Sequence, residues 1–176
     1  TAVLAVLKGV RKVRVYDLDR ESAQTYCQEL EGTYSIKARA VDSVEQAVRG
    51  SHVINVATSG AVSPVIEDAW LEDGVLLTLP ASADVSERLM SESSIVVDNW
   101  KMYEAYAQEL RDEPGGFAAN LSGICGYLMD LERAGTVRRE NILELGDIAA
   151  GKVPGRRSQQ EKIIFIMDGM PVEDVA

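Results

Sequence analysis

The chain has 176 residues, of which 46% are apolar and 26% charged, and its formal net charge is −10. These values fit one globular domain with a sizeable core and exclude a disordered chain. The acidic balance argues against a nucleic-acid partner, because such proteins present a basic face. No apolar run reaches the roughly 18 residues of a membrane span and no signal peptide is visible, so we expect a cytoplasmic protein without a membrane partner.

In chain order, short apolar strands alternate with helices. The first pair is a strand over residues 13–16 and a helix over residues 20–30, which Asp19 caps and Gly32 ends. The later predicted strands cover residues 35–41, 52–57, 74–79, 94–98 and 161–167, and the later helices cover residues 43–48, 100–111, 121–134, 140–150 and the end of the chain from Pro171. This alternation predicts an α/β fold with a doubly wound parallel sheet.

Several side chains that often carry chemistry are better explained by packing. Cys27 and Cys125 fall in helical patterns without a metal-ligand spacing, so we expect two buried thiols and no metal site. The single histidine, His52, begins a strand at the edge away from the expected ligand side and is interpreted as structural. Trp100 and the Tyr103–Tyr106 pair have helical spacing, which favours packing over a binding platform.

Ligands of an open parallel sheet bind beyond the carboxyl ends of its strands. Asp17 ends the first strand, where dinucleotide-binding folds place the carboxylate that bonds the ribose hydroxyls, about 20 residues after a glycine-rich turn. That spacing puts the turn before Thr1 and makes residues 1–7 part of the helix whose N-terminus holds the pyrophosphate. Alternatively, Asp17 and Asp19 only cap a turn and a helix.

The expected cofactor is NAD. NADP stays possible because Arg20, close to Asp17, has the chemistry to accept a 2′-phosphate. Thr58 and Ser59 follow a strand in a loop with Gly60, where small hydroxyl side chains admit a ligand, although an ordinary turn has the same composition. The predicted cofactor-binding residues are Asp17, Leu18, Arg20, Ala57, Thr58, Ser59, Met167 and Gly169.

Asp84 is the candidate catalytic residue. It follows the strand at residues 74–79 by a few positions, in a loop of small residues, and an apolar setting would raise the pKa of a carboxylate toward acid–base use. The competing interpretation is structural, because Asp84 or Ser86 could cap the helix that begins near Glu87.

These stretches resemble a known family. The strand ends are similar at Val15-Tyr16-Asp17-Leu18-Asp19-Arg20, at residues 54–59 and at residues 95–98. The most specific likeness is the run from Glu144 to Arg156, followed by residues 163–165 and by the Gly-Met-Pro-Val-Glu-Asp ending that begins at Gly169. Together they resemble the ornithine cyclodeaminase/mu-crystallin family over nearly the whole chain.

The resemblance implies a Rossmann-like NAD(P)-binding domain, here residues 1–176, of a two-domain homodimeric enzyme. The glycine-rich turn and the domain for substrate binding and dimerisation would lie outside this chain. By the same resemblance, Asp17 bonds the adenosine ribose and Thr58 contacts the cofactor. The family's catalytic aspartate falls in the loop after residues 74–79, where Asp84 is the candidate; if Ala83 occupies that position, the acid–base role fails.

The family chemistry is hydride transfer at the Cα–N bond of a small amino-acid-like substrate, through an imine. After Phe165 this chain has Ile166 and Met167 where cyclodeaminases carry an Asp-Ser pair. Its ending is similar to a branch that includes the 2,3-diaminopropionate-forming N-(2-amino-2-carboxyethyl)-L-glutamate dehydrogenase, which serves siderophore and antibiotic pathways. The alternatives are an ornithine cyclodeaminase that forms proline and ammonia, and a mu-crystallin-like binding protein without turnover.

Overall fold

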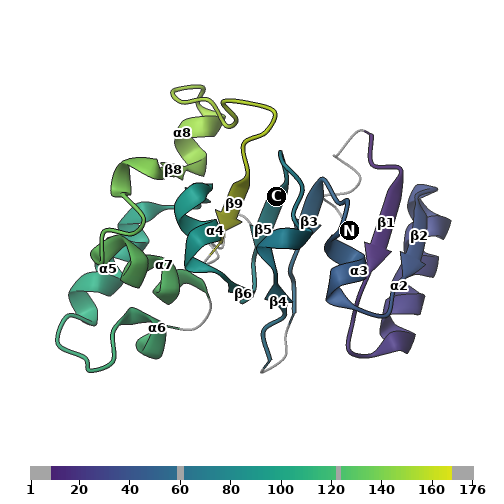
Figure 1. Cartoon of the computed structure of the whole chain (residues 1–176), viewed down its shortest axis with the longest axis horizontal. Coiled ribbons are helices and arrows are strands. Elements are labelled where there is room, and N and C mark those ends of the chain that lie inside the picture. Colours follow the sequence, from purple (N-terminus) through teal and green to yellow (C-terminus); the bar gives the residue numbers. More distant parts are fainter. Residues whose placement is uncertain (1–8, 59–61, 122–123, 168–176) are drawn as a thin grey trace. The chain divides into compact units, whose positions relative to one another are not determined.

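The computed structural model describes residues 9–58, 62–121 and 124–167, and the chain divides into two compact units, residues 1–49 and 50–176. Each unit is built around parallel strands with helices packed on them, which confirms an α/β, Rossmann-like fold (Figure 1). The helices predicted at residues 1–7 and from Pro171 lie outside the described residues.

The first unit is a two-stranded parallel sheet with helices. Strands β1 (Lys12–Val15) and β2 (Lys37–Ala40) pair in register, and helices α2 (Arg20–Tyr34) and α3 (Val44–Val48) follow them. Helix α2 begins where predicted, because the Asp19 carboxylate accepts a hydrogen bond from Glu21 N at 3.1 Å. Its buried residues Ala23, Cys27 and Leu30 have the spacing of one helical face.

The predicted end of α2 at Gly32 is wrong. The helix continues to Tyr34 and ends at Ser35, which takes the left-handed conformation with φ 53°. A glycine inside a helix costs about 1 kcal/mol relative to alanine, which is less than tertiary contacts on the same helix can supply. The cap of α3 is confirmed, because Ser43 Oγ accepts from Gln46 N at 3.2 Å.

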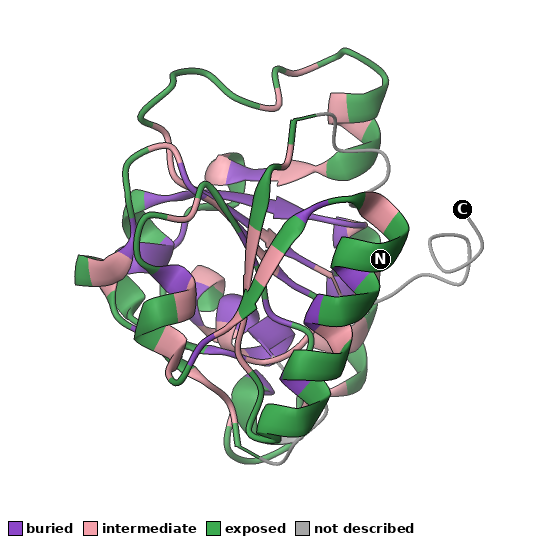
Figure 2. Cartoon of the chain, turned by 90° about the vertical axis from the view of Figure 1, so that its right-hand side faces the viewer, coloured by how far each residue is buried: buried purple, intermediate pink, exposed green. Residues whose placement is uncertain are grey.

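The second unit contains a five-stranded sheet in which every pairing is parallel. Its strand order is β3-β5-β9-β7-β8, so the last strand of the chain is inserted at the centre (Figure 1). The strands are β3 (Val53–Asn55), β5 (Leu76–Leu79), β9 (Ile163–Ile166), β7 (Ser94–Val97) and β8 (Ile142–Glu144). Every residue of β7 is buried, as expected of a strand covered on both faces. Figure 2 shows strands coloured as buried and helices that carry both buried and exposed residues.

Shorter elements surround this sheet. The helices are α4 (Glu87–Glu92), α5 (Trp100–Glu109), α6 (Phe117–Asn120), α7 (Ile124–Arg133) and α8 (Leu145–Ala149), with 3-10 turns η1 (Asp68–Trp70) and η2 (Arg139–Asn141). Two short strands, β4 (Val65–Ile66) and β6 (Asp84–Val85), form a separate parallel pair. The sequence patterns did not predict β4, β6 or α6.

The helix predicted over residues 140–150 is also wrong. Residues 142–144 form β8, which pairs with β7 through Ile95 and Ile142, and within the predicted range only residues 145–149 are α-helical. The strand exists because a fully buried neighbour offers it a hydrogen-bonding edge. That edge is supplied by a segment almost fifty positions away, so local periodicity does not reveal it.

Helix α6 depends on a side chain from the next helix. Its N-cap position is Gly116, which has no side-chain acceptor, and the Asp130 carboxylate instead accepts from Phe117 N at 2.9 Å and Ala118 N at 2.8 Å. The two helices meet closely at Gly126, where a Cβ would lie 2.6 Å from Phe117 O. Glycine at this position is therefore required by packing.

Within the described residues, no helix has the length and apolar character needed to span a membrane. The same residues contain no group of three or more His, Cys, Asp or Glu side chains arranged to hold a metal ion. Cys27 and Cys125 are both buried, as predicted, and Cys125 Sγ lies 3.7 Å from the Tyr103 hydroxyl.

Candidate functional site

The turn between β1 and α2 brings together three of the predicted cofactor-binding residues. Asp17 lies two residues beyond the end of β1, is exposed, and accepts a hydrogen bond from Asp19 N at 2.9 Å through Oδ1. Leu18 beside it is 81% exposed, and Arg20 begins α2. The turn thus presents a carboxylate, an apolar side chain and a guanidinium at the carboxyl edge of its sheet.

The Asp19 side chain caps the N-terminus of α2. Its carboxylate accepts from the Ser22 hydroxyl at 2.6 Å and from Glu21 N, and these bonds, the Ser22 hydroxyl first, lower the pKa of Asp19. A stable negative charge at a helix N-terminus favours the helix. Asp19 therefore takes the capping role, which leaves Asp17 available for another task.

In the second unit, the predicted residues lie at the carboxyl edge of the five-stranded sheet. Ala57 and Thr58 follow β3 and are exposed, and Met167 follows β9 and is half-buried. Since β3 and β9 are the two neighbours of β5, these residues flank the end of that strand. Ser59 and Gly169, which were also predicted to bind the cofactor, lie outside the described residues.

A polar pair supports the β3 end of this edge. The Thr78 hydroxyl on β5 donates to Asn55 Oδ1 on β3 at 2.6 Å, and the two residues are register partners. Val56 N continues the pairing by donating to Thr78 O at 3.0 Å. The segment that carries Thr58 thus leaves the sheet from a fixed position.

Asp84 is exposed and lies on a strand. It pairs with Val65 across β4 and β6, and its backbone N donates to Pro64 O at 2.9 Å. The capping role belongs to Ser86, whose hydroxyl accepts from Leu89 N at 2.9 Å. The structure therefore gives Asp84 neither the cap nor the apolar enclosure that the sequence suggested, and its catalytic role stays a prediction.

Asp84 lies within electrostatic reach of Tyr127 on α7. Burial raises the pKa of Tyr127 on α7, and the nearby charges of Glu87 and Asp84 raise it further.

Asp98 is a residue at this edge to which the sequence analysis gave no role. It follows β7 directly, is only 5% exposed, and accepts from Asn99 N at 2.9 Å. Asn99 in turn caps α5 by accepting from Lys101 N. Among the described residues Asp98 is the one charged residue in the buried class. Its position directly after the apolar run Ile95-Val96-Val97 was the available signal.

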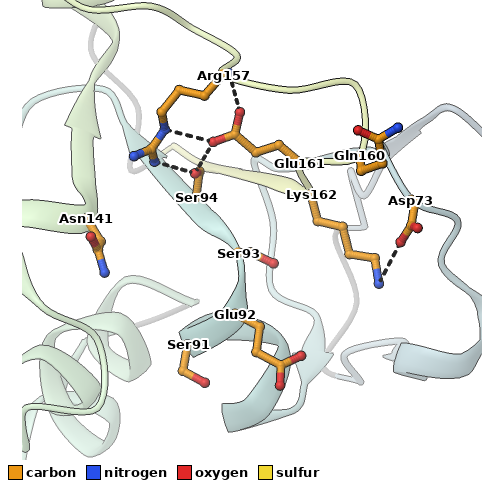
Figure 3. A pocket seen from close by; sticks show the side chains of 10 residues that line it. All are labelled: Asp73, Ser91, Glu92, Ser93, Ser94, Asn141, Arg157, Gln160, Glu161 and Lys162. Atoms are coloured by element: carbon orange, nitrogen blue, oxygen red, sulfur yellow. Dashed lines mark hydrogen bonds and ion pairs between the residues drawn. The ribbon is translucent and has the colours of Figure 1, made fainter.

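A polar cavity of about 390 Å³ lies at the opposite, amino edge of the sheet (Figure 3). It is lined by residues that precede or begin strands, including Asp73, Asn141 and Lys162. Two ion pairs lie within its lining: Lys162 Nζ lies 3.8 Å from Asp73 Oδ1, and Arg157 Nε lies 3.0 Å from Glu161 Oε1. Because ligands of parallel sheets bind at the carboxyl edge, we do not assign this cavity to the cofactor.

The cavity wall is a hydrogen-bonded latch made of Arg157, Glu161 and Ser94. The Ser94 hydroxyl donates to Glu161 Oε1 at 2.5 Å and accepts from Arg157 Nη2 at 2.8 Å, while Arg157 N donates to Glu161 Oε2 (Figure 3). Burial alone raises the pKa of Glu161, but the bonds from Ser94 and Arg157 outweigh it and the net pKa is lowered. These bonds hold the loop of residues 152–160 to the start of β7.

Comparison with known proteins identifies the family. The family model described as "Ornithine cyclodeaminase/mu-crystallin family" matches residues 1–176. The chain is 25% identical to the uncharacterised cyclodeaminase y4tK of Sinorhizobium fredii, over 98% of this chain and 48% of that protein. It is 24% identical to the N-((2S)-2-amino-2-carboxyethyl)-L-glutamate dehydrogenase of Staphylococcus aureus, over 99% of this chain and 47% of that protein.

A solved structure has the same fold. The Δ1-pyrroline-2-carboxylate reductase of Thermococcus litoralis, in complex with NADH and L-proline, superposes with a TM-score of 0.73 at 21% identity, over 98% of this chain and 50% of that one. The chain spans about half the length of the curated relatives it matches. On the evidence of the family model, which covers every residue, the chain belongs to the ornithine cyclodeaminase/mu-crystallin family.

Proposed function

We propose that this chain is the dinucleotide-binding part of an NAD(H)-dependent oxidoreductase that transfers hydride at an amino-acid Cα–N bond through an imine. The observation that carries the proposal is the turn after β1, where the exposed Asp17 carboxylate and the exposed Leu18 side chain stand at the carboxyl edge of a parallel sheet. A carboxylate there suits the ribose hydroxyls, and an apolar surface beside it suits the adenine ring. Similarity to the NADH-bound reductase supports the choice of cofactor.

The residues present fit NAD. When bound, NAD accepts or donates the hydride, and the protein supplies position and electrostatics. In the first unit, Asp17 would hold the ribose and Leu18 would cover the adenine. In the second unit, the exposed Ala57 and Thr58 after β3 are the proposed cofactor contacts. Met167, after the central strand, stands where the reacting end of a ligand at this edge is expected.

In this proposal Asp84 exchanges the proton that accompanies formation or hydrolysis of the imine. Its exposure on β6 means that a further surface must exclude water from it during turnover; the chain spans about half the length of the relative from Staphylococcus aureus. Family resemblance favours a homodimer, and the acyclic amino-acid conjugate named for the Staphylococcus aureus relative is the first substrate to test. The resemblance of the chain's ending to the branch that includes this dehydrogenase supports a proposed role in making siderophore or antibiotic precursors.

The test is turnover by the protein at its full natural length. NADH absorbance is followed with NAD and a panel that includes N-(2-amino-2-carboxyethyl)-L-glutamate, alanine, proline and ornithine. Ornithine turnover is also followed as proline and ammonia, because a cyclodeaminase recycles its hydride. We expect NADH formation with one amino-acid substrate, and a loss of kcat of roughly 100-fold in Asp84→Asn, the usual size of an acid–base contribution.

The control is Asp73→Asn, which removes an exposed carboxylate at the amino edge of the five-stranded sheet and should leave kcat unchanged. A kcat that is equal in Asp84→Asn and wild type would remove Asp84 from the mechanism and leave the oxidoreductase assignment standing.

A second candidate function is a binding protein without turnover. The exposed position of Asp84 on β6, away from any apolar enclosure, favours it. NADH binding with no turnover of any substrate in either assay would support this alternative over the enzyme.

A further inference from the structure

Asp17 has a structural counterpart on the neighbouring strand. In the register of β1 and β2, Val15 pairs with Ala40, and each strand is followed two residues later by an aspartate, Asp17 and Asp42. Val41 N donates to Val15 O at 2.9 Å, which continues the ladder one step past the strands. The two carboxylates therefore leave the same edge of the same small sheet.

Asp42 engages the cation that stands next to Asp17. Arg20, the first residue of α2, pairs through Nη1 with Asp42 Oδ1. Asp42 is itself fixed, because its backbone N donates to Gln46 Oε1 at 3.2 Å in the first turns of α3. Arg20, which the sequence analysis considered as a partner for a 2′-phosphate, is therefore paired with the Asp42 carboxylate.

We infer that Asp42, by pairing with Arg20, makes this chain select a dinucleotide with a free 2′-hydroxyl over one with a 2′-phosphate. A phosphate group carries nearly two negative charges and needs a cation such as Arg20. Here it would meet the Asp17 carboxylate and find Arg20 already paired. A ribose hydroxyl is neutral and meets no such penalty. This selectivity depends on the NAD site proposed above.

The Arg20–Asp42 pair is a suitable target because it contributes little to folding. The two side chains are 66% and 60% exposed, and ion pairs that exposed add little to stability. Removing Asp42 should therefore change nucleotide selection without unfolding the unit.

Other cations lie nearby. Arg14 and Arg39 are register partners one residue before the strand ends, and Arg14 donates to Arg49 O. A variant that lacks both Asp42 and Arg20 separates the contribution of Arg14 and Arg39 from that of Arg20.

The experiment measures dissociation constants for NADH and NADPH by nucleotide fluorescence, on the full-length protein and its variants. Wild type is expected to bind NADH more tightly. Asp42→Asn should improve NADPH affinity relative to NADH by roughly tenfold, the value of one charge-assisted bond to phosphate, and Arg20→Ala in the same chain should abolish the gain.

The matched control is Glu45→Gln. It removes one exposed carboxylate of the same unit, which pairs with Arg49 at 2.6 Å, and it should leave the ratio within twofold of wild type. An unchanged ratio in Asp42→Asn, or an equal gain in Glu45→Gln, would overturn the selectivity while the NAD site stands. If wild type binds neither nucleotide, the proposed function fails together with the selectivity.

Discussion

At the scale of single residues, Ser93 and Ser94 are neighbours with equal burial and different bonding. Both are 8% exposed at the junction of α4 and β7. Ser94 bonds both Glu161 and Arg157. Ser93 Oγ is the one buried side-chain oxygen or nitrogen in the described part of the chain that has no hydrogen-bond partner. A buried polar group without a partner loses its hydration and gains nothing in return.

This contrast predicts opposite effects of the same substitution. Ser94→Ala should lower the free energy of unfolding by about 2 kcal/mol, because it removes two bonds of the latch. Ser93→Ala should leave that free energy unchanged or raise it by up to about 1 kcal/mol. Urea denaturation at pH 7 measures both. Equal destabilisation by the two variants would mean that Ser93 has a partner of comparable strength.

Residue-level features were predictable where the determinant is local. Asp19 and Ser43 cap helices as their positions indicated, because a cap needs only a side chain and the next turn. Asp84 was harder to interpret, since its environment depends on β4, about twenty positions earlier. The ion pair of Asp42 and Arg20 could not be predicted, because the two residues are 22 positions apart in the sequence and meet only in the folded unit.

At the scale of elements, the loop of residues 152–160 depends on the latch. Arg157 N and Nε both donate to Glu161, whose side chain is only 12% exposed. The same loop touches the start of β5, because Gly74, with φ 79°, donates from N to Gln160 O at 3.0 Å. A Cβ at Gly74 would lie 2.2 Å from Gln159 O, so no other residue fits this contact.

The lowered pKa of Glu161 predicts a pH dependence. A carboxyl whose pKa is lower in the folded state stabilises the fold above its ordinary value of 4.5, and that contribution is lost as pH falls through the folded-state pKa. Glu161→Gln should therefore cost about 2 kcal/mol at pH 7 and progressively less below pH 4.5. Urea denaturation between pH 7 and pH 3 measures the difference.

The control is Glu92→Gln, which changes a carboxylate that lines the same cavity and pairs with Arg88 in an exposed position. It should stay within about 0.5 kcal/mol of wild type at every pH. If the cost of Glu161→Gln is the same at pH 3 and pH 7, the latch does not depend on the ionised carboxylate.

The elements that sequence patterns missed share a physical cause. Strand β8 exists because it pairs with β7, and α6 is capped by Asp130 from another helix. Strands β4 and β6 are two residues long, which is too short for any periodicity. Elements with their own caps and apolar faces were predictable, whereas those held by distant partners were not.

At the scale of the whole molecule, the sequence predicted the α/β class. It also predicted that the candidate ligand-binding residues follow the carboxyl ends of the strands. The strand order could not be predicted, because β9, which comes last in the chain, pairs between β5 and β7. That insertion places Met167 next to the ends of β5 and β7, and so beside Asp98. The family supplies the expectation of a nicotinamide cofactor, and the turn after β1 supplies the residues that would hold it.

The central claim is that Asp17 binds the ribose of NAD(H). The most direct measurement is the dissociation constant of NADH for the full-length wild type, for Asp17→Asn and for the control Glu21→Gln, which changes an exposed carboxylate in the first turn of α2. We predict a roughly tenfold weaker constant for Asp17→Asn and an unchanged one for Glu21→Gln. Equal affinity of Asp17→Asn and wild type would contradict the claim.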